Sequence, residues 1–589
     1  MKAVQHLEKK TKQSFLHGAV ILTVATVIVK VVGALFKIPL GNIIGATGMG
    51  YFNTAYTIFN AVYSLAIAGL PIAVAKLVAE NEALGRHKNT RKILNISRVL
   101  FIATGLTGSC IMLFSARLCA NLANNPNAFG AVIALAPTIF FACVMSIYRG
   151  YYEGLKNMYP TAISQIVEAV VKTVAGLGLA ILAIELATKS YNTTGSIFGI
   201  AVGGAEEANT VILAFAAAGA FAAAGAVFGV SISTIGGAVY LLFRHKTKGD
   251  GITKEELEAS TVPEETKKIL KSLIKIAIPV CLGAVAISLT SFIDTFSIMN
   301  RLAVAIKADM NLIVSQYGEI LPTETKEIPN FLWGAYGLVQ TLFNLVPAIT
   351  TTFGVSALPA ISSAWALRDE REMTKNVSTA LKITCLVAIP AGIGMCILAE
   401  PIVKLLYYNK VEEAIIAVPV LQVLGIAVVF VSFMTPINSM LQGIGKAHVP
   451  VILMIIGGAL KLVVNYIFVA MPQFNIKAAS WGTLVCYVFI AVASVIMLIK
   501  YTRIKLDFKT IFLKPLISGI ICGATAFGAY FALTKFLPSS ISTLGSIAIA
   551  AVFYAISLIL LKTLAKDDIL MLPKGEKLVK ILAKRNLLS

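Results

Sequence analysis

The chain has 589 residues, of which 57% are hydrophobic and only 13% are charged. A soluble domain usually carries about 25% charged residues, so this composition excludes an ordinary soluble protein. The net charge of +21 is dispersed along the chain and does not indicate a nucleic-acid partner.

Apolar segments long enough to cross a bilayer follow one another from one end of the chain to the other. The first follows a basic start, but its length, the internal Lys30 and the absence of a small-residue cleavage site indicate a retained helix rather than a signal peptide. We predict fourteen transmembrane helices, near residues 15–37, 51–78, 95–116, 129–148, 160–186, 211–243, 273–299, 331–366, 379–400, 414–441, 450–471, 479–499, 514–536 and 544–562.

Lysine and arginine are concentrated in the segments that face the cytoplasm if the amino terminus lies inside. This asymmetry predicts a multi-pass protein with both termini in the cytoplasm. We divide the chain into five parts: an N-lobe (1–243), a cytoplasmic linker (244–272), a C-lobe (273–500), an added helix pair (501–562) and a basic cytoplasmic tail (563–589).

The two lobes carry matching sequence features. Leu70-Pro71 matches Leu358-Pro359, and Lys172 matches Lys461 at nearly the same offset. Each lobe starts inside and has an even number of spans, so the repeats run parallel, about an axis along the membrane normal. The predicted fold class is therefore an all-α polytopic membrane protein with two six-helix repeats, a substrate cavity between them and two further C-terminal helices.

Charged residues within the spans are the first candidates for substrate contacts, because a lysine at the bilayer centre costs roughly 2.5–3.5 kcal/mol. Lys30, Lys172 and Lys461 lie deepest, and we expect each to face the cavity. Lys37 lies closer to the end of its span and is expected to reach the interface instead. This excess of deep lysines favours an anionic substrate.

Two carboxylates are predicted to act as counter-charges or switches. Asp294 lies deep in the seventh span, where the repeat places it opposite Lys30 across the cavity. Glu168 precedes Lys172 by one turn, so these two side chains can pair and neutralise each other locally. Three uncharged residues are expected to extend the substrate-binding surface: Asn60, Gln340 and Asn344. Hydrogen bonds between helices explain these three residues equally well.

The cysteines and histidines form no catalytic or metal-binding motif. The eight cysteines contain no CxxC pair and lie mostly in apolar runs, as buried small hydrophobic residues do. The five histidines lie near helix ends or in polar segments. We expect no catalytic residue, no bound metal and no cofactor, while coupling to an ion or to the membrane potential stays open.

Several short motifs resemble those of a known transporter family. They are Lys30-x2-Gly33 followed by Gly45-Ala46-x-Gly48-x-Gly50, Gly69-Leu70-Pro71, and Leu441-Gln442-Gly443-x-Gly445-Lys446. Together with the arrangement of six, six and two spans, they resemble the polysaccharide-exporter branch of the multidrug/oligosaccharidyl-lipid/polysaccharide (MOP) superfamily. Within that branch the chain looks most like the stage V sporulation protein B and lipid II flippase group.

This resemblance implies alternating access that moves a polyprenyl-pyrophosphate-linked cell-wall precursor from the inner to the outer leaflet of a bacterial plasma membrane. Lipid II, for peptidoglycan synthesis, is the favoured substrate. The implied partners are this lipid-linked anionic glycan, the membrane lipids and the cell-wall synthesis machinery. The two added spans would help to form a groove for the lipid tail.

The chain departs from the family at its cavity arginines. Lys30 stands at the position of the arginine in the first span, and no arginine lies in the second span between Tyr51 and Leu77. The identity of the lipid-linked substrate therefore stays open, as does a vegetative or a sporulation-specific role.

Three other functions are weighed against the lipid II flippase. A flippase for a capsule or surface-polysaccharide unit would need the same features. A cation-coupled multidrug exporter predicts an acidic cavity, which the deep lysines oppose. A membrane-embedded glycosyltransferase or ligase would need catalytic carboxylates, and the acids of the outer segment 301–330 are expected to form a solvated loop.

Overall fold

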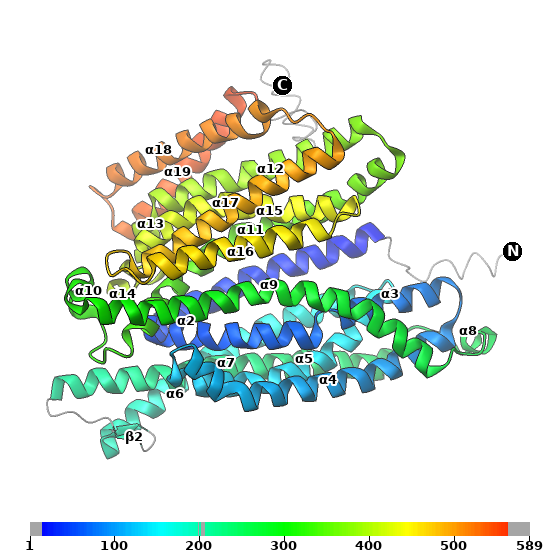
Figure 1. Ribbon diagram of the computed structural model, residues 1–589, viewed down its shortest axis with the longest axis horizontal. Helices are drawn as coiled ribbons and strands as arrows, with labels where there is room; N and C mark the ends of the chain where they lie inside the picture. Colours follow the sequence, from blue (N-terminus) through cyan, green and yellow to red (C-terminus); the bar gives the residue numbers. More distant parts are fainter. Residues whose placement is uncertain (1–14, 198–199, 202–206, 564–589) are drawn as a thin grey trace. The chain divides into compact units, whose positions relative to one another are not determined.

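The computed structural model of the chain is a polytopic bundle of long helices, which confirms the predicted all-α class (Figure 1). It describes the backbone of residues 15–197, 200–201 and 207–563. The strands in this part of the chain are one antiparallel pair of two residues each, β1 (Ser196–Ile197) and β2 (Ile200–Ala201).

Contacts divide the chain into two compact units. Unit 1 comprises Met1–Asn300 with Pro322–Gly334, and unit 2 comprises Arg301–Leu321 with Ala335–Ser589. The predicted C-lobe begins at residue 273, whereas the contacts of helix α9 (Thr266–Ala308) group it with unit 1 through Asn300.

The helical elements of unit 1 besides α9 are α2 (Phe15–Ile67), α3 (Leu70–Ala83), α4 (His87–Leu122), η1 (Pro126–Ala128), α5 (Phe129–Gly154), α6 (Tyr159–Thr194), α7 (Glu207–Lys248), the short α8 (Lys254–Ala259) and the start of α11. Unit 2 contains α10 (Met310–Tyr317), η2 (Gly318–Ile320), most of α11 (Ile328–Leu367), α12 (Glu370–Ile397), α13 (Ala399–Leu406), α14 (Val411–Ile415), α15 (Val418–Gly443), α16 (His448–Phe468), α17 (Asn475–Thr502), η3 (Lys509–Leu513), α18 (Lys514–Leu533) and α19 (Ser539–Leu560).

Within the described residues, twelve helices are long and apolar enough to cross a membrane. One of them runs from Val24 to Ala83, which covers the second predicted span and most of the first. Helix α9 is not in this set, and several of its side chains lie outside the described part of the chain. The chain is therefore a multi-pass membrane protein, and the total of fourteen spans stays a prediction.

Helix α2 reverses direction at Gly45. This residue has φ 65° and ψ −172°, a conformation that is essentially restricted to glycine. In a straight helix Phe36 and Phe52 would lie about 24 Å apart, yet their ring centroids are separated by 6.1 Å. Residues 15–44, the first arm, and residues 46–67, the second arm, therefore form a helical hairpin.

Helix α9 packs antiparallel to the second arm of α2. The hydroxyl oxygens of Ser64 and Ser288 are 2.5 Å apart, and the Thr295 hydroxyl donates to Thr57 Oγ1 at 3.0 Å. Residue numbers rise along one helix as they fall along the other. At the end of this contact a Cβ on Gly69 would lie 2.1 Å from the Ala277 carbonyl oxygen, so the Gly69-Leu70-Pro71 motif serves a close approach of two backbones.

Unit 2 has its own apolar core, to which α11, α12, α15, α16 and α17 contribute. Helices α18 and α19 pair with each other, and they pack against α12 and α13 respectively. The added helix pair is therefore part of unit 2.

Candidate functional site

Three lysines gather in unit 1, and they form the lysine cluster: Lys30 and Lys37 on the first arm of α2, and Lys172 on α6. Lys172 Nζ lies 5.6 Å from the centre of the Phe36 ring, and Lys37 Nζ lies 5.7 Å from that of Phe52. Lys37 interacts electrostatically with both other lysines, and Lys30 also acts on Lys172. The cluster concentrates positive charge, and an anion is its complementary ligand.

The hairpin at Gly45 explains why the cluster forms. It brings Phe52 against Phe36, so that each ring presents a face to an ammonium group. Lys30 is exposed, whereas Lys37 and Lys172 are half-buried. The position of Lys37 at the membrane interface stays a prediction, and its ammonium group lies over the Phe52 ring of the second arm.

Glu168, a predicted counter-charge, pairs with an arginine that the sequence analysis missed. Arg149 on α5 donates from Nη2 to Glu168 Oε2 at 3.0 Å and from Nε to Ser164 Oγ at 2.8 Å. Glu168 also acts electrostatically on Lys172, as the one-turn spacing suggests. Arg149 is hard to recognise from sequence alone, because it lies just beyond the predicted span 129–148.

Asp294 is half-buried on α9, next to the Thr295 hydroxyl that contacts the second arm. Asn60 is exposed on that arm. Both residues belong to unit 1, as Lys30 does. The pairing of Asp294 with Lys30 stays a prediction.

The remaining predicted residues belong to unit 2. Lys461 on α16 is only 7% exposed, at a close contact between α16 and α17. A Cβ on Gly482 of α17 would lie 3.4 Å from Lys461 Cγ and 2.2 Å from Asn465 Oδ1. On α11, Gln340 is half-buried and Asn344 is exposed. Lys382 on α12 is also 7% exposed.

A large apolar groove runs along unit 2. It has a volume of about 1140 Å³ and lies between α12, α15 and α17 on one side and η3 and α18 on the other. Its lining consists of apolar side chains and glycines apart from Gln422, with Val429, Phe433, Ile496 and Phe512 among them. This volume exceeds the range of roughly 300–1,000 Å³ typical of small-molecule pockets.

A buried carboxylate lies at the start of α11, within unit 1. Glu327 accepts hydrogen bonds from Tyr51 Oη at 2.5 Å, Asn127 Nδ2 at 2.6 Å and Asn330 Nδ2 at 3.5 Å. Asn125 joins Asn330 to the second arm by donating to Asn330 Oδ1 at 2.8 Å and to Thr54 Oγ1 at 3.0 Å. The predicted solvated loop is therefore wrong for Glu327, which is 8% exposed.

Metal and disulfide chemistry find no structural support in the described residues. No group of three or more histidine, cysteine, aspartate or glutamate side chains in that part of the chain could hold a metal ion. Its eight cysteines are all free thiols.

Comparisons with known proteins agree with this architecture. Residues 15–205 match the polysaccharide biosynthesis protein family, and residues 310–467 match the MatE family. The chain is 25% identical to the lipid II flippase MurJ of Bacillus subtilis (strain 168) over 473 residues, which cover 78% of each protein. It is 24% identical to stage V sporulation protein B of the same organism over 575 residues, covering 95% of this chain and 98% of the relative.

A solved structure extends the similarity to the fold. An inward-facing multidrug resistance MATE family transporter of the MOP superfamily superposes with a TM-score of 0.55 at 15% identity. The superposition covers 81% of this chain and 98% of that transporter. The two chains therefore share a fold.

Proposed function

Because the chain matches the polysaccharide biosynthesis protein and MatE families and is similar to the lipid II flippase MurJ, we propose that it is a MOP-superfamily flippase for a polyprenyl-pyrophosphate-linked cell-wall precursor, with lipid II as the leading substrate. The substrate would move from the inner to the outer leaflet of a bacterial plasma membrane, and both termini of the protein would lie in the cytoplasm. Transport of this kind makes and breaks no covalent bond.

The lysine cluster is the observation that carries this proposal. A pyrophosphate needs several cations, and lysine binds phosphate as a point charge without a fixed geometry. Lys37 and Lys172 would hold the head group, and the exposed Lys30 would meet it first. The same charges oppose a cationic drug as the substrate.

The apolar groove of unit 2 supports a substrate with a long hydrocarbon tail. Burial of apolar surface contributes roughly 25 cal/mol per Å², so an almost entirely apolar groove favours a polyprenyl chain over a polar ligand. The proposed substrate combines both features, because it has an anionic head group and a long hydrocarbon tail.

The other predicted residues have supporting roles in this proposal. Lys461 would contribute to the positive electrostatic potential that attracts an anionic substrate. The amides of Asn60, Gln340 and Asn344 would contact polar parts of the glycan. When no substrate is bound, Asp294 and Glu168 would balance the positive charge of the lysines.

Depletion of the protein tests the proposal. In cells without a redundant flippase, we expect lipid II to accumulate in the cytoplasmic leaflet. Accumulation of a different lipid-linked glycan would assign the protein to capsule or surface-polysaccharide export. Normal export of every lipid-linked precursor would contradict the flippase function.

A further inference from the structure

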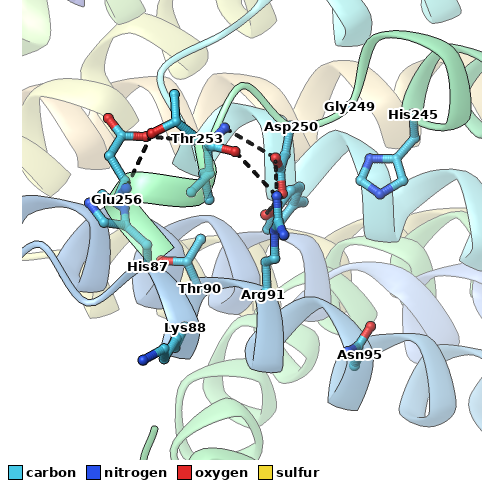
Figure 2. Close-up of polar contacts among 12 residues, drawn as sticks. His87, Lys88, Thr90, Arg91, Asn95, His245, Gly249, Asp250, Thr253 and Glu256 are labelled. Carbon is cyan, nitrogen blue, oxygen red and sulfur yellow. Dashed lines mark hydrogen bonds and ion pairs between the residues drawn. The ribbon is translucent and has the colours of Figure 1, made fainter. Parts of the chain in front are cut away.

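A small cationic pocket lies in unit 1, at the end that the charge asymmetry predicts to be cytoplasmic (Figure 2). We call it the Arg98 pocket. It has a volume of about 260 Å³ and is lined by Arg91, Leu94, Asn95, Arg98, His245, Gly249 and Asp250. These residues come from α4, from the end of α7 and from the turn that follows α7.

One wall of the pocket is fixed by a bidentate ion pair. Arg91 Nε and Nη2 donate to Asp250 Oδ2 and Oδ1 at 2.9 and 3.1 Å (Figure 2). Asp250 also accepts from the Tyr151 hydroxyl and from the Ile252 backbone amide, both at 3.1 Å. The only carboxylate of the lining is thus fully engaged, which limits its repulsion of an anion.

The rest of the lining keeps unused donors. Arg98 Nη1 donates to Asn95 Oδ1 at 3.2 Å, and its guanidinium lies 5.5 Å from the centre of the Tyr148 ring. Arg98 Nε is buried and has no hydrogen-bond partner among the described residues. The Asn95 amide keeps its NH2 group. The Tyr152 hydroxyl donates to the Gly249 carbonyl oxygen at 2.9 Å, so His245 Nδ1 donates to that hydroxyl at 3.0 Å and Nε2 of the neutral ring is an acceptor.

The local charge is positive overall. His245 interacts electrostatically with Arg98, Arg91 and Arg244, and with the single carboxylate of Asp250. Guanidinium and amide donors around one small pocket match the oxygens of a phosphate group.

The surface beside the pocket indicates which class of molecule carries the phosphate group. Val99 and Ile102 follow Asn95 on α4 at spacings of four and seven residues, and Val99 is 72% exposed. On α7, Phe243 is 67% exposed next to Arg244 and His245. Exposed apolar side chains therefore lead from the pocket into the predicted spans, as acyl chains lead away from a lipid head group.

We propose that the Arg98 pocket binds the phosphate of an anionic phospholipid of the cytoplasmic leaflet. The lipid would be a structural partner distinct from the transported substrate, because the lining of the pocket contains no residue of the lysine cluster. It would also join α4 to the turn after α7, where the linker begins.

Binding of short-chain phosphatidylglycerol to the full-length protein in nanodiscs of phosphatidylcholine tests the proposal, with native mass spectrometry as the readout. Asn95→Asp keeps an oxygen acceptor for Arg98 but adds a negative charge to the pocket. Asn121→Asp, on an exposed residue near the other end of α4, is the matched control. Arg98→Gln removes the main cation, and Lys254→Gln controls for the loss of one positive charge.

We expect Asn95→Asp and Arg98→Gln to weaken phosphatidylglycerol binding at least about tenfold, since a hydrogen bond to a charged group is worth roughly 1.5–3 kcal/mol. Both controls should bind like the parent protein. Unchanged binding in Asn95→Asp would overturn the proposal even if Arg98→Gln failed to fold. If inorganic phosphate bound in an Arg98-dependent way and phosphatidylglycerol did not bind, the proposal of a lipid ligand would be overturned. The pocket would then be a site for a soluble phosphate.

Discussion

At the scale of single residues, the cost of burying an ammonium group governs the lysine cluster. Lys37 and Lys172 are half-buried, and a phenylalanine ring beside each replaces part of the lost hydration. Three like charges in one region remain unfavourable without a counter-ion. A bound pyrophosphate relieves this repulsion, so each lysine should contribute strongly to substrate affinity.

Substitution of Lys172 by glutamine should reduce flipping of lipid II at least about tenfold, because it removes one charged contact to the head group. Lys172→Arg should retain more activity than Lys172→Gln. Lys535→Gln is the control, because Lys535 also lies over a phenylalanine, Phe531, at 4.9 Å but in unit 2. Equal activities of Lys172→Gln and Lys535→Gln in a flipping assay would argue against the head-group role.

Glu327 should make the stability of the protein depend on pH. Burial raises the pKa of its carboxyl above the ordinary value of 4.5, and the hydrogen bonds from Tyr51, Asn127 and Asn330 lower it by less. A carboxyl group whose pKa is higher in the folded state than in the unfolded state stabilises the folded protein at low pH. This contribution is complete below the pKa of the unfolded state, and it is lost as the pH rises through the pKa of the folded state.

Thermal unfolding of the parent protein and of Glu327→Gln between about pH 4 and about pH 8 checks this sign. The melting temperature of the parent relative to Glu327→Gln should fall as the pH rises. Glu319→Gln, on an exposed acid of the same segment between α9 and α11, should show no such trend. A difference that grows with pH would show that Glu327 is held in its ionised form.

The residues that could be predicted from the sequence are those whose signal is local. Lys30 and Lys172 stand out because each charge interrupts an apolar run. Lys37 and Arg149 could not be recognised, since their roles depend on the hairpin in α2 and on the packing of α5 against α6. Glu327 was misread because an acidic loop and a buried acid at a helix start look alike in sequence.

At the scale of elements, the reversal of α2 at Gly45 sets the position of both the lysine cluster and the contact with α9. Alanine at this position would adopt a strained backbone conformation, at a cost of about 1–3 kcal/mol. Gly45→Ala should therefore lower the melting temperature of the purified protein.

Gly33→Ala is the matched control for Gly45→Ala. Gly33 is helical in the first arm, and a Cβ there would meet no atom within 4 Å. Its melting temperature should equal or exceed that of the parent, because alanine favours a helix over glycine. Equal destabilisation by both substitutions would contradict the special role of Gly45.

The helices themselves were largely predictable, because apolar length determines a transmembrane segment almost independently of its neighbours. The sequence predicted the α2 hairpin only as two separate spans. It also placed α9 in the C-lobe, whereas the contacts through Ser288 and Thr295 tie this helix to unit 1. Such pairings depend on hydroxyl contacts between helices that have no sequence pattern of their own.

At the scale of the whole molecule, the proposed transport requires a cationic region for the head group and an apolar groove for the tail. Ala524 lines this groove and is exposed, so Ala524→Trp should fill part of it without disturbing the core of unit 2. We expect slower flipping at an unchanged melting temperature. Ala548→Trp, on an exposed alanine of α19 outside the groove lining, should flip normally.

Flipping of lipid II by the purified protein in proteoliposomes tests the central claim most directly. The account predicts that the parent protein moves labelled lipid II between leaflets and that Lys172→Gln, folded and inserted to the same extent, does so at least about tenfold more slowly. Movement of lipid II at the rate of protein-free liposomes, with the parent protein correctly folded, would contradict it.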